Sequence, residues 1–284
     1  MTRDKAFAEL KRILVPLDAS EHSLEVLKAA VELAAAQGAE LEGLFVEDAD
    51  LFRLCEFPMA REVSFWGVSG RSMERSETER QLRIVARRLQ RALEDMSRGH
   101  NVPCKFRVTR GGVPREVLDA SKEADLTIMG RIGWSRLCGQ RMGSTTQAIV
   151  RQGRGLVLIM DKEARFQPPL QVLFTGSRLS EATLLLALEL SRKKGFSLVI
   201  LMAAHAQENR KDMQDRVQEI VSGQGAQAGV HLLRELNPQG IRKAVAAHGT
   251  GPLFLPCEDP HLHGESLQQL INSLNNPVFL VRDR

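Results

Sequence analysis

The amino-acid sequence predicts an α/β protein made of two tandem domains, each with an open parallel sheet. Three observations lead to this prediction: short apolar strands alternate with helical stretches, the order of these elements occurs twice, and each copy ends in an apolar strand. Strands joined through helices form right-handed crossovers and place helices on both faces of a parallel sheet. A length of 284 residues suits two domains.

The first copy begins with the apolar strand 12–17, which ends at Asp18. Apolar residues at helical spacing follow, and Gly38 closes that helix before the strand 41–46. A Gly-Val-Pro sequence at 112–114 precedes a further helix. The last two strands of this copy are expected at 125–129 and 155–160, with a helix between them.

The second copy repeats this plan from the strand 170–174 onward, and Gly195 closes its first helix where Gly38 closes the first helix of the other copy. Its last strand is expected at 277–281. The charged stretch 161–169 ends in a Pro pair and predicts the joint. We therefore expect domains at 1–163 and 168–284, related by a pseudo-two-fold axis.

Residues 50–72 interrupt the plan of the first copy with aromatic side chains and several Gly and Pro residues. The segment reads as irregular and follows the second strand, on the edge where open α/β sheets bind ligands. Two interpretations remain open: a flap over a site, or a surface loop held by a few aromatic residues.

Composition favours an ordinary globular protein, with 43% hydrophobic and 26% charged residues. No apolar run is long enough to span a bilayer, and the first residues lack a signal-peptide core, so we expect a cytoplasmic protein without a membrane partner. Four widely spaced cysteines argue against zinc ribbons and disulfide frameworks. Of these, Cys138 lies among arginines that would lower its thiol pKa.

The formal net charge of +4 is spread over both halves. The one concentrated basic feature is a helical stretch in which Arg80, Arg83, Arg87 and Arg91 lie opposite an apolar face. Such stripes are usually solvated and paired with nearby carboxylates, as Glu79 with Arg83 would be. Because no aromatic residues interleave with these arginines, the stripe argues against a nucleic-acid partner.

The segment 130–146 carries most of the chemical information in the chain. It follows a predicted strand and leads into a helix, and it contains three arginines and no carboxylate. Glycines in such a loop let the backbone approach an anion, and a helix start favours negative charge. The segment therefore predicts a phosphate site.

Gly130 is followed after two residues by Gly133, and after nine more by Gly143 and Ser144. Together with the first strand and its terminal Asp18, this spacing resembles the nucleotide-binding pattern of the universal stress protein family, in a tandem arrangement. The resemblance is specific over residues 12–161. It implies a Rossmann-like fold of the adenine nucleotide alpha hydrolase type, and ATP as the ligand, with a divalent metal such as Mg2+.

The resemblance also implies roles for individual residues. Asp18 would hold the ribose or adenine side, with Pro16 shaping the turn, while Val46 would pack beside the adenine and Met129 would back the ribose. The phosphates would be cradled by Gly130, Gly133, Gly143, Ser144 and Thr145.

Simpler roles remain open at several of these positions. Asp18 is also a candidate for the N-cap of the first helix, and Ser144 and Thr145 for caps of a later one. Val46 also suits the core. Arg131, where a small residue is usual, would either contact phosphate or point to solvent.

The second copy lacks the pattern. Thr175 replaces Asp18, Ala203 replaces Val46, and counting back from the last strands aligns Gly143 and Ser144 with Gly264 and Glu265. A carboxylate at a helix start would occupy or repel the phosphate position, so we expect a structural role for this copy, as a docking partner for the first domain, or a site for something other than ATP. The histidines and carboxylates within 258–263 lack metal-ligand spacing and are interpreted as loop surface.

The leading functional hypothesis is an ATP-binding protein of stress response or signalling that changes shape or partners. No residue is convincingly placed to orient an attacking water, and no P-loop lysine is present, so at most weak ATPase activity is expected. An interaction module that no longer binds nucleotide is the further alternative. The family commonly dimerises through its last strand, a contact that a tandem chain can make internally between the regions of Met160 and Val281; a homodimer of the whole chain stays open.

Overall fold

The fold is described from a computed structural model that covers residues 10–57, 59, 61–62, 71–72, 74–131, 142–161, 165–203, 207–257, 262 and 264–283. Strands and helices alternate along this part of the chain, and the sheet is open. The predicted α/β class is therefore confirmed.

The elements of the first half are β1 (Arg12–Pro16), α1 (Glu21–Gln37), β2 (Glu40–Asp48), α2 (Ala49–Leu54), β3 (Arg61–Glu62), β4 (Arg71–Ser72), α3 (Arg75–Gly99), β5 (Cys104–Gly111), α4 (Val113–Ser121), β6 (Leu126–Gly130), α5 (Ser144–Gln152) and β7 (Leu156–Met160). Those of the second half are β8 (Leu170–Phe174), α6 (Arg178–Lys194), β9 (Leu198–Ala203), α7 (Gln207–Gly223), β10 (Ala228–Leu233), α8 (Pro238–His248), β11 (Leu253–Pro256), α9 (Gly264–Ser273) and β12 (Val278–Val281).

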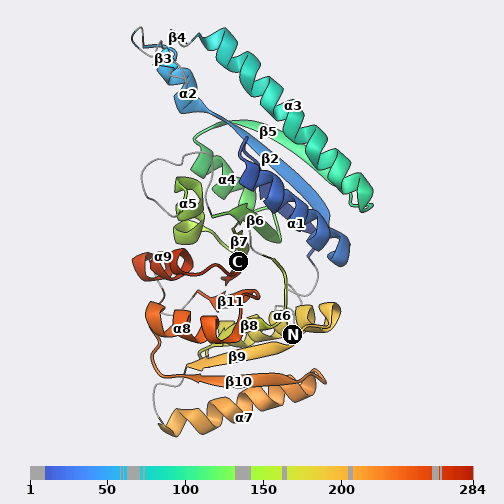
Figure 1. The fold of residues 1–284 in the computed structure, drawn as a ribbon, viewed down its shortest axis with the longest axis vertical. Coiled ribbons are helices and arrows are strands. Elements are labelled where there is room, and N and C mark those ends of the chain that lie inside the picture. The colour runs from blue at the N-terminus through green and yellow to red at the C-terminus, as the bar shows by residue number, and fades with distance from the viewer. Residues whose placement is uncertain are drawn as a thin grey trace.

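One ten-stranded sheet runs through the molecule in the order β10-β9-β8-β11-β12-β7-β6-β1-β2-β5 (Figure 1). The five strands of each half follow one another in the same spatial order. Neighbours within each half pair in parallel, whereas β7 and β12 pair antiparallel where the halves meet. Leu158 and Phe279 lie opposite each other at the centre of this pair. An antiparallel pair of equivalent strands is what a local two-fold axis produces.

The first helix of each half repeats in detail. Both α1 and α6 have 17 residues, and their N-caps, Ser20 and Ser177, accept hydrogen bonds from the backbone three residues on. Both end at a glycine in the left-handed region, with φ of 66° at Gly38 and 67° at Gly195. Glycine adopts that conformation without the steric cost of a Cβ, so it is the usual residue at this position.

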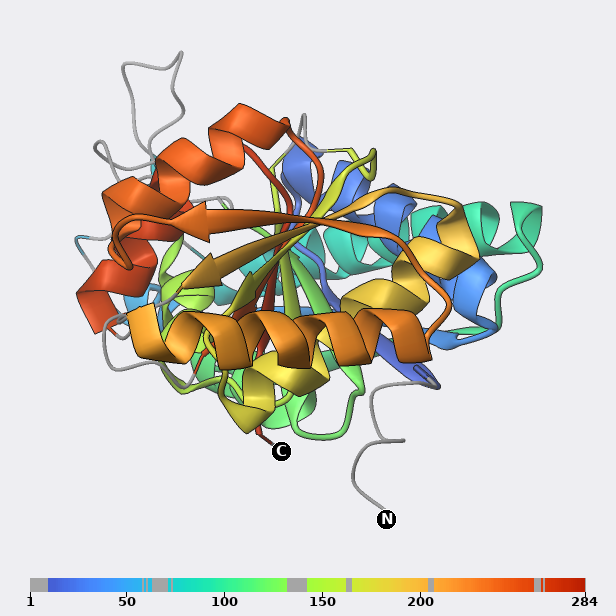
Figure 2. The ribbon, with the colours of Figure 1, turned by 90° about the horizontal axis from the view of Figure 1, so that it is seen from below.

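Helices cover both faces of the sheet: α1, α3, α6 and α7 pack on one face, and α4, α5, α8 and α9 on the other. The division within the second half is visible from below, with α6 and α7 on one side of the twisted strands and α8 and α9 on the other (Figure 2). Alternation along β1 sends Ile13 and Val15 to the first layer and Leu14 to the second. Each apolar layer contains residues from both halves.

Side-chain contacts also tie the halves together, next to a stack within the second half in which the Phe279 ring of β12 lies on Phe254 of β11 with centroids 4.4 Å apart. Arg282 donates from Nη1 to the Ile149 carbonyl at 3.3 Å, and from Nη2 to the next carbonyl, near the C-terminal end of α5. Cations near the end of a helix satisfy its last carbonyls. On the opposite face, Lys193 Nζ donates to Gln37 Oε1 at 2.9 Å.

The prediction that residues 50–72 are irregular is wrong for their beginning. The helix α2 continues directly from β2, because Asp48 caps it by accepting a hydrogen bond from the backbone of Asp50 at 2.9 Å. Strands β3 and β4 form a short antiparallel pair. Residues 58, 60, 63–70 and 73 lie outside the described part of the chain.

Candidate functional site

The predicted ligand-binding residues of the first half gather at one edge of the sheet. β1 lies between β6 and β2 and is parallel to both, so the carboxyl ends of these strands meet there. Pro16 is the last residue of β1 and Gly130 the last of β6. Val46 and Met129 are buried below this edge, in the apolar layer under α4 and α5. Open α/β sheets bind ligands in this region.

The two ends of the glycine-containing segment come together. The backbone N–H of Gly143 donates to the carbonyl of Arg131 at 2.9 Å. Thr146 Oγ1 donates to the carbonyl of Gly130 at 2.9 Å. These bonds hold the start of α5 against the end of β6. Gly133 lies outside the described residues, as do residues 132–141 generally.

The N-terminal end of α5 has no side-chain cap among the described residues. Its N-cap is Gly143, which has no side chain to cap the helix, and its first turn contains no acidic residue. Ser144 is exposed and Thr145 is half-buried. The interpretation of Ser144 and Thr145 as N-caps is therefore wrong. Backbone N–H groups in this turn combine with the helix dipole to favour an anion.

Asp18 does not act as the N-cap of α1, because Ser20 does. The Ser20 hydroxyl accepts from the Ser23 N–H at 3.2 Å. Asp18 Oδ1 accepts from the Ser20 N–H at 2.9 Å and from the Ser20 hydroxyl, and its own N–H donates to Ser23 Oγ at 3.0 Å. These bonds fix the half-buried carboxylate beside the end of β1.

Arg131 does not point to solvent. Its backbone N–H donates to the carbonyl of Met160 at 2.8 Å, and its side chain is only 4% exposed. The guanidinium Nη1 lies 3.7 Å from Asp161 Oδ2. The side chain therefore supports the end of β6 and β7 from within.

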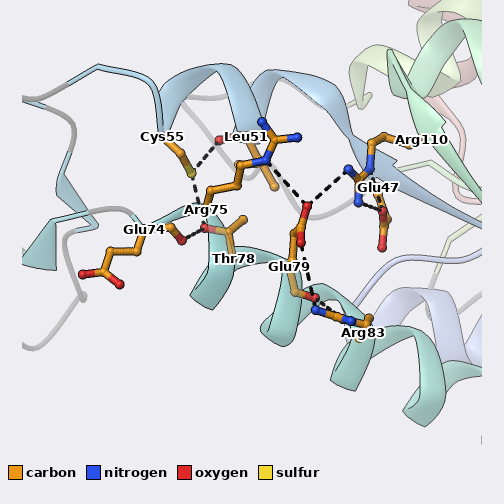
Figure 3. A network of polar contacts seen from close by, with 9 residues as sticks. All are labelled: Glu47, Leu51, Cys55, Glu74, Arg75, Thr78, Glu79, Arg83 and Arg110. Carbon is orange, nitrogen blue, oxygen red and sulfur yellow. Dashed lines mark hydrogen bonds and ion pairs between the residues drawn. The ribbon is translucent and has the colours of Figure 1, made fainter.

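A polar network fixes α2 next to the end of β2 (Figure 3). Glu47, which follows Val46 and is 9% exposed, accepts from Arg110 Nε at 2.9 Å. The Arg110 guanidinium lies 4.1 Å from the centroid of the buried Phe52 ring. Arg110 also contacts Glu79 on α3 at 3.4 Å. The hydrogen bond to Glu47 is the largest cause of the raised pKa of Arg110.

Sequence reasoning missed this network. Glu47 and Arg110 are far apart in sequence, and only the β2–β5 register, which pairs them directly, brings them together. The available signal was the position of Glu47 at the end of a predicted strand.

The same edge in the second half has a different lining. Cys257 donates its N–H to the carbonyl of Val281 at 2.9 Å, as Arg131 does to Met160, so Pro256 takes the position of Gly130. Burial raises the pKa of the Cys257 thiol to about 11, which keeps it protonated and unreactive at neutral pH. Proline has no N–H to offer a ligand.

The described second-half positions that correspond to Asp18 and to the start of α5 also carry different residues. Thr175 stands where Asp18 does and donates to Ser177 Oγ at 3.3 Å. The first turn of α9 contains Glu265, whereas the first turn of α5 contains no carboxylate. The helix α5 begins at Ser144 and α9 begins at Gly264, so the structure pairs Ser144 with Gly264. Counting back from the last strands paired Gly143 with Gly264, which is one residue off.

Among the described residues, no group of three or more His, Cys, Asp or Glu side chains is arranged to hold a metal ion. The cluster considered within 258–263 lies outside them, except for the buried Leu262. Cys55, Cys104 and Cys257 are free thiols, and Cys138 is not described. In the part of the chain searched, no helix has the length and apolarity to cross a membrane.

Comparison with known proteins gives a consistent result. The model of the universal stress protein family matches residues 9–160. The universal stress protein Sll1388 of Synechocystis is 27% identical over 154 residues, which are 52% of this chain and 96% of that protein.

Solved structures match nearly the whole chain. A universal stress protein from Archaeoglobus fulgidus has a TM-score of 0.70 at 16% identity, with 98% of each chain covered. The protein PA1789 from Pseudomonas aeruginosa has a TM-score of 0.61 at 13% identity, with 98% of this chain and 95% of that chain covered. These likenesses show the fold. Because the family model spans more than half of the sequence, the chain belongs to the universal stress protein family.

Proposed function

We propose that this chain binds ATP, together with Mg2+, at the carboxyl edge of its first half. Binding of the nucleotide would change the shape of the protein, or the partners that the protein binds, in stress response or signalling. The family gives the stress-response role. A single observation carries the nucleotide proposal: hydrogen bonds close the loop between β6 and α5. Gly143 donates to the carbonyl of Arg131, and Thr146 donates to the carbonyl of Gly130.

This closure supports phosphate binding because it aims an uncapped helix start at the edge where three strands end. A helix of this kind offers backbone N–H groups and a favourable dipole to an anion. Gly143, Ser144 and Thr145 would donate to the phosphates. Hydroxyl and phosphate oxygens are also the hard ligands that Mg2+ prefers.

The other end of the nucleotide would lie over β1 and β2. The Asp18 carboxylate, held by Ser20, would accept hydrogen bonds from the ribose or adenine. Val46 and Met129 would form the apolar floor. Gly130 would allow close approach of the phosphates, and Gly133 is assigned the same role from the sequence pattern alone.

Binding is favoured over catalysis. Asp18 is already engaged by two donors of Ser20, which suits a fixed ligand contact better than a base that must accept a proton. We further propose that 1–163 and 168–284 are separate domains of one tandem protein and that the second is structural. The three free thiols among the described cysteines fit the reducing cytoplasm.

Calorimetric titration of the purified chain with ATP and Mg2+ tests the proposal. One site per chain is expected, and Asp18→Asn should weaken it on the order of tenfold by removing a charge-assisted contact. Thr175→Val, at the equivalent position of the second half, is the matched control and should leave the affinity unchanged. Absence of binding at millimolar ATP would overturn the proposal, and ATP turnover abolished by Asp18→Ala would favour an ATPase.

A further inference from the structure

The outward side of α3 concentrates positive charge. The helix contains seven arginines, four carboxylates and no lysine. Ala86, Leu89 and Leu93 are buried against the sheet, and the opposite side is exposed. The exposed side between 80 and 91 carries no carboxylate, and we call it the arginine face; its members are Arg80, Arg83, Ile84, Arg87, Arg88 and Arg91.

Much of this charge is not neutralised. Arg80 lies 3.7 Å from Glu77, and Arg83 lies 4.0 Å from Glu79, both long contacts between largely solvated groups. Arg87, Arg88 and Arg91 form no ion pair with any residue that the structure describes. The nearest carboxylate toward the C-terminal end, that of Glu94, accepts a hydrogen bond from Gln90 at 2.9 Å instead.

The cations of the neighbouring strand β5 are matched by acids on β2. Lys105 lies 2.7 Å from Glu40, Arg107 lies 2.7 Å from Glu42, and Arg110 lies 2.8 Å from Glu47. The excess of positive charge in this region therefore lies on α3 itself.

The position and shape of the arginine face indicate a macromolecular partner. α3 is the outer helix at one end of the molecule (Figure 1). Its arginines follow one side of the helix for about 16 Å, at 1.5 Å per residue. A convex ridge does not enclose a small molecule, whose sites are concave.

Three observations favour a protein partner of limited length over a polyanion. Ile84 is 56% exposed in the middle of the arginines. The charges are all arginine, and arginine is enriched and lysine depleted at protein interfaces. Carboxylates border the face at both ends, with Glu77 and Glu79 before it and Glu94 and Asp95 after it. A nucleic-acid backbone or a bilayer would extend past both ends and meet these acids.

We propose that the arginine face binds an acidic amphipathic helix of another protein. The partner would lie along α3 for about three turns, with an apolar residue against Ile84 and carboxylates toward the arginines. Guanidinium groups bind carboxylates through paired hydrogen bonds, which gives such a contact its specificity.

The equivalent helix of the second half, α7, has no such face. It contains three basic and four acidic residues. Arg216 is held by Glu181 at 2.7 Å and by Glu219 at 2.8 Å. Because Arg210 and Lys211 are exposed on α7, they provide a matched control for the charge of α3.

The test is a titration of the full chain with a synthetic helical peptide that presents glutamates around one leucine at the spacing of one helix face. A peptide with glutamine in place of glutamate is the control. The acidic peptide is expected to bind, and the triple variant R87Q/R88Q/R91Q to lose at least about tenfold in affinity. Ile84→Ser should cost less, and R210Q/K211Q should change nothing.

A charge-reversed pair separates specific pairing from general attraction. The variant R87E/R88E/R91E should reject the acidic peptide and bind a peptide with arginine in place of glutamate. These substitutions are on exposed positions, and unchanged thermal unfolding would show that the fold is kept. Equal binding of the glutamate and glutamine peptides would overturn the proposal. So would tighter binding of duplex DNA or phosphatidylglycerol vesicles through the same arginines.

Discussion

The two halves of this protein present the same edge of the same sheet with different chemistry. In the first half, the edge carries the Asp18 carboxylate and an uncapped helix start without acids. In the second half, Thr175 and Pro256 occupy the matching positions, and Glu265 lies in the first turn of α9. The helices α1 and α6, by contrast, agree in length and in the geometry of their caps.

This difference separates what the fold requires from what a ligand requires. Capping serines, helix-ending glycines and buried strand residues serve the fold, and both halves keep them. Edge residues contribute little to packing, so a half that does not bind a ligand can replace them without loss of structure. The contrast therefore predicts one nucleotide site per chain.

The largest expected effect concerns the seam between the halves, which is the antiparallel pair of β7 and β12. Phe279→Ala removes the stack on Phe254 and should lower the free energy of unfolding by about 3–5 kcal/mol. Leu158→Ala, directly across the seam, should lower it by about 2–5 kcal/mol. Because both apolar layers contain residues of both halves, urea unfolding should remain a single transition. Two separate transitions would show that the halves fold independently.

The second prediction introduces into α5 the acidic residue that the first turn of α9 carries. Thr145→Glu puts a carboxylate in the first turn of α5, as Glu265 is in α9. ATP affinity measured by calorimetry should fall on the order of 100-fold, because like charges are brought together at the phosphates. Glu265→Gln should leave it unchanged. If the two variants bind ATP equally well, the first turn of α5 is not the phosphate site.

The third prediction compares the two capping serines. Ser20→Ala and Ser177→Ala each remove an N-cap and should cost about 1 kcal/mol of stability in urea. Only Ser20 also binds the Asp18 carboxylate, so only Ser20→Ala should weaken ATP binding as well, by severalfold. An equal effect of both variants on affinity would argue that Asp18 does not contact the nucleotide.

The smallest effect concerns the two outer strands. Arg107 on β5 and His231 on β10 lie at equivalent positions of these strands. Arg107 is paired with Glu42 and Glu123. The ring centroid of His231 lies 4.9 Å from that of His248. Burial, and then the neighbouring His231, lower the pKa of His248. The folded state therefore favours the neutral imidazole, and the unfolded chain binds more protons below about pH 6.5.

Stability from this group is present above that pH and is lost as the pH falls through the lowered pKa. Urea unfolding between about pH 7 and pH 5 should show this decline, and His248→Gln should make it shallower. Arg107→Gln should not alter the slope over the same range. An unchanged slope in the His248 variant would place the acid sensitivity elsewhere.

Much of the fold was predictable because its signals are local. The apolar strands, the helix-ending Gly38 and Gly195, and the repeated order of elements all follow from neighbouring residues. Asp18, Gly130 and Gly143 were placed at strand or helix ends for the same reason. The sequence left Asp18 open as an N-cap beside its expected ligand role, since two nearby residues suited the cap and only the backbone geometry selects Ser20.

The sequence by itself determined the α/β class, the family pattern and the loss of that pattern in the second half. The tertiary structure alone decided three things: the antiparallel register in which β7 pairs with β12, the burial of Arg131, and the network of Glu47 with Arg110. Each of these depends on contacts between residues distant in sequence. Strand register and burial follow from how all elements pack together, and no local pattern specifies them.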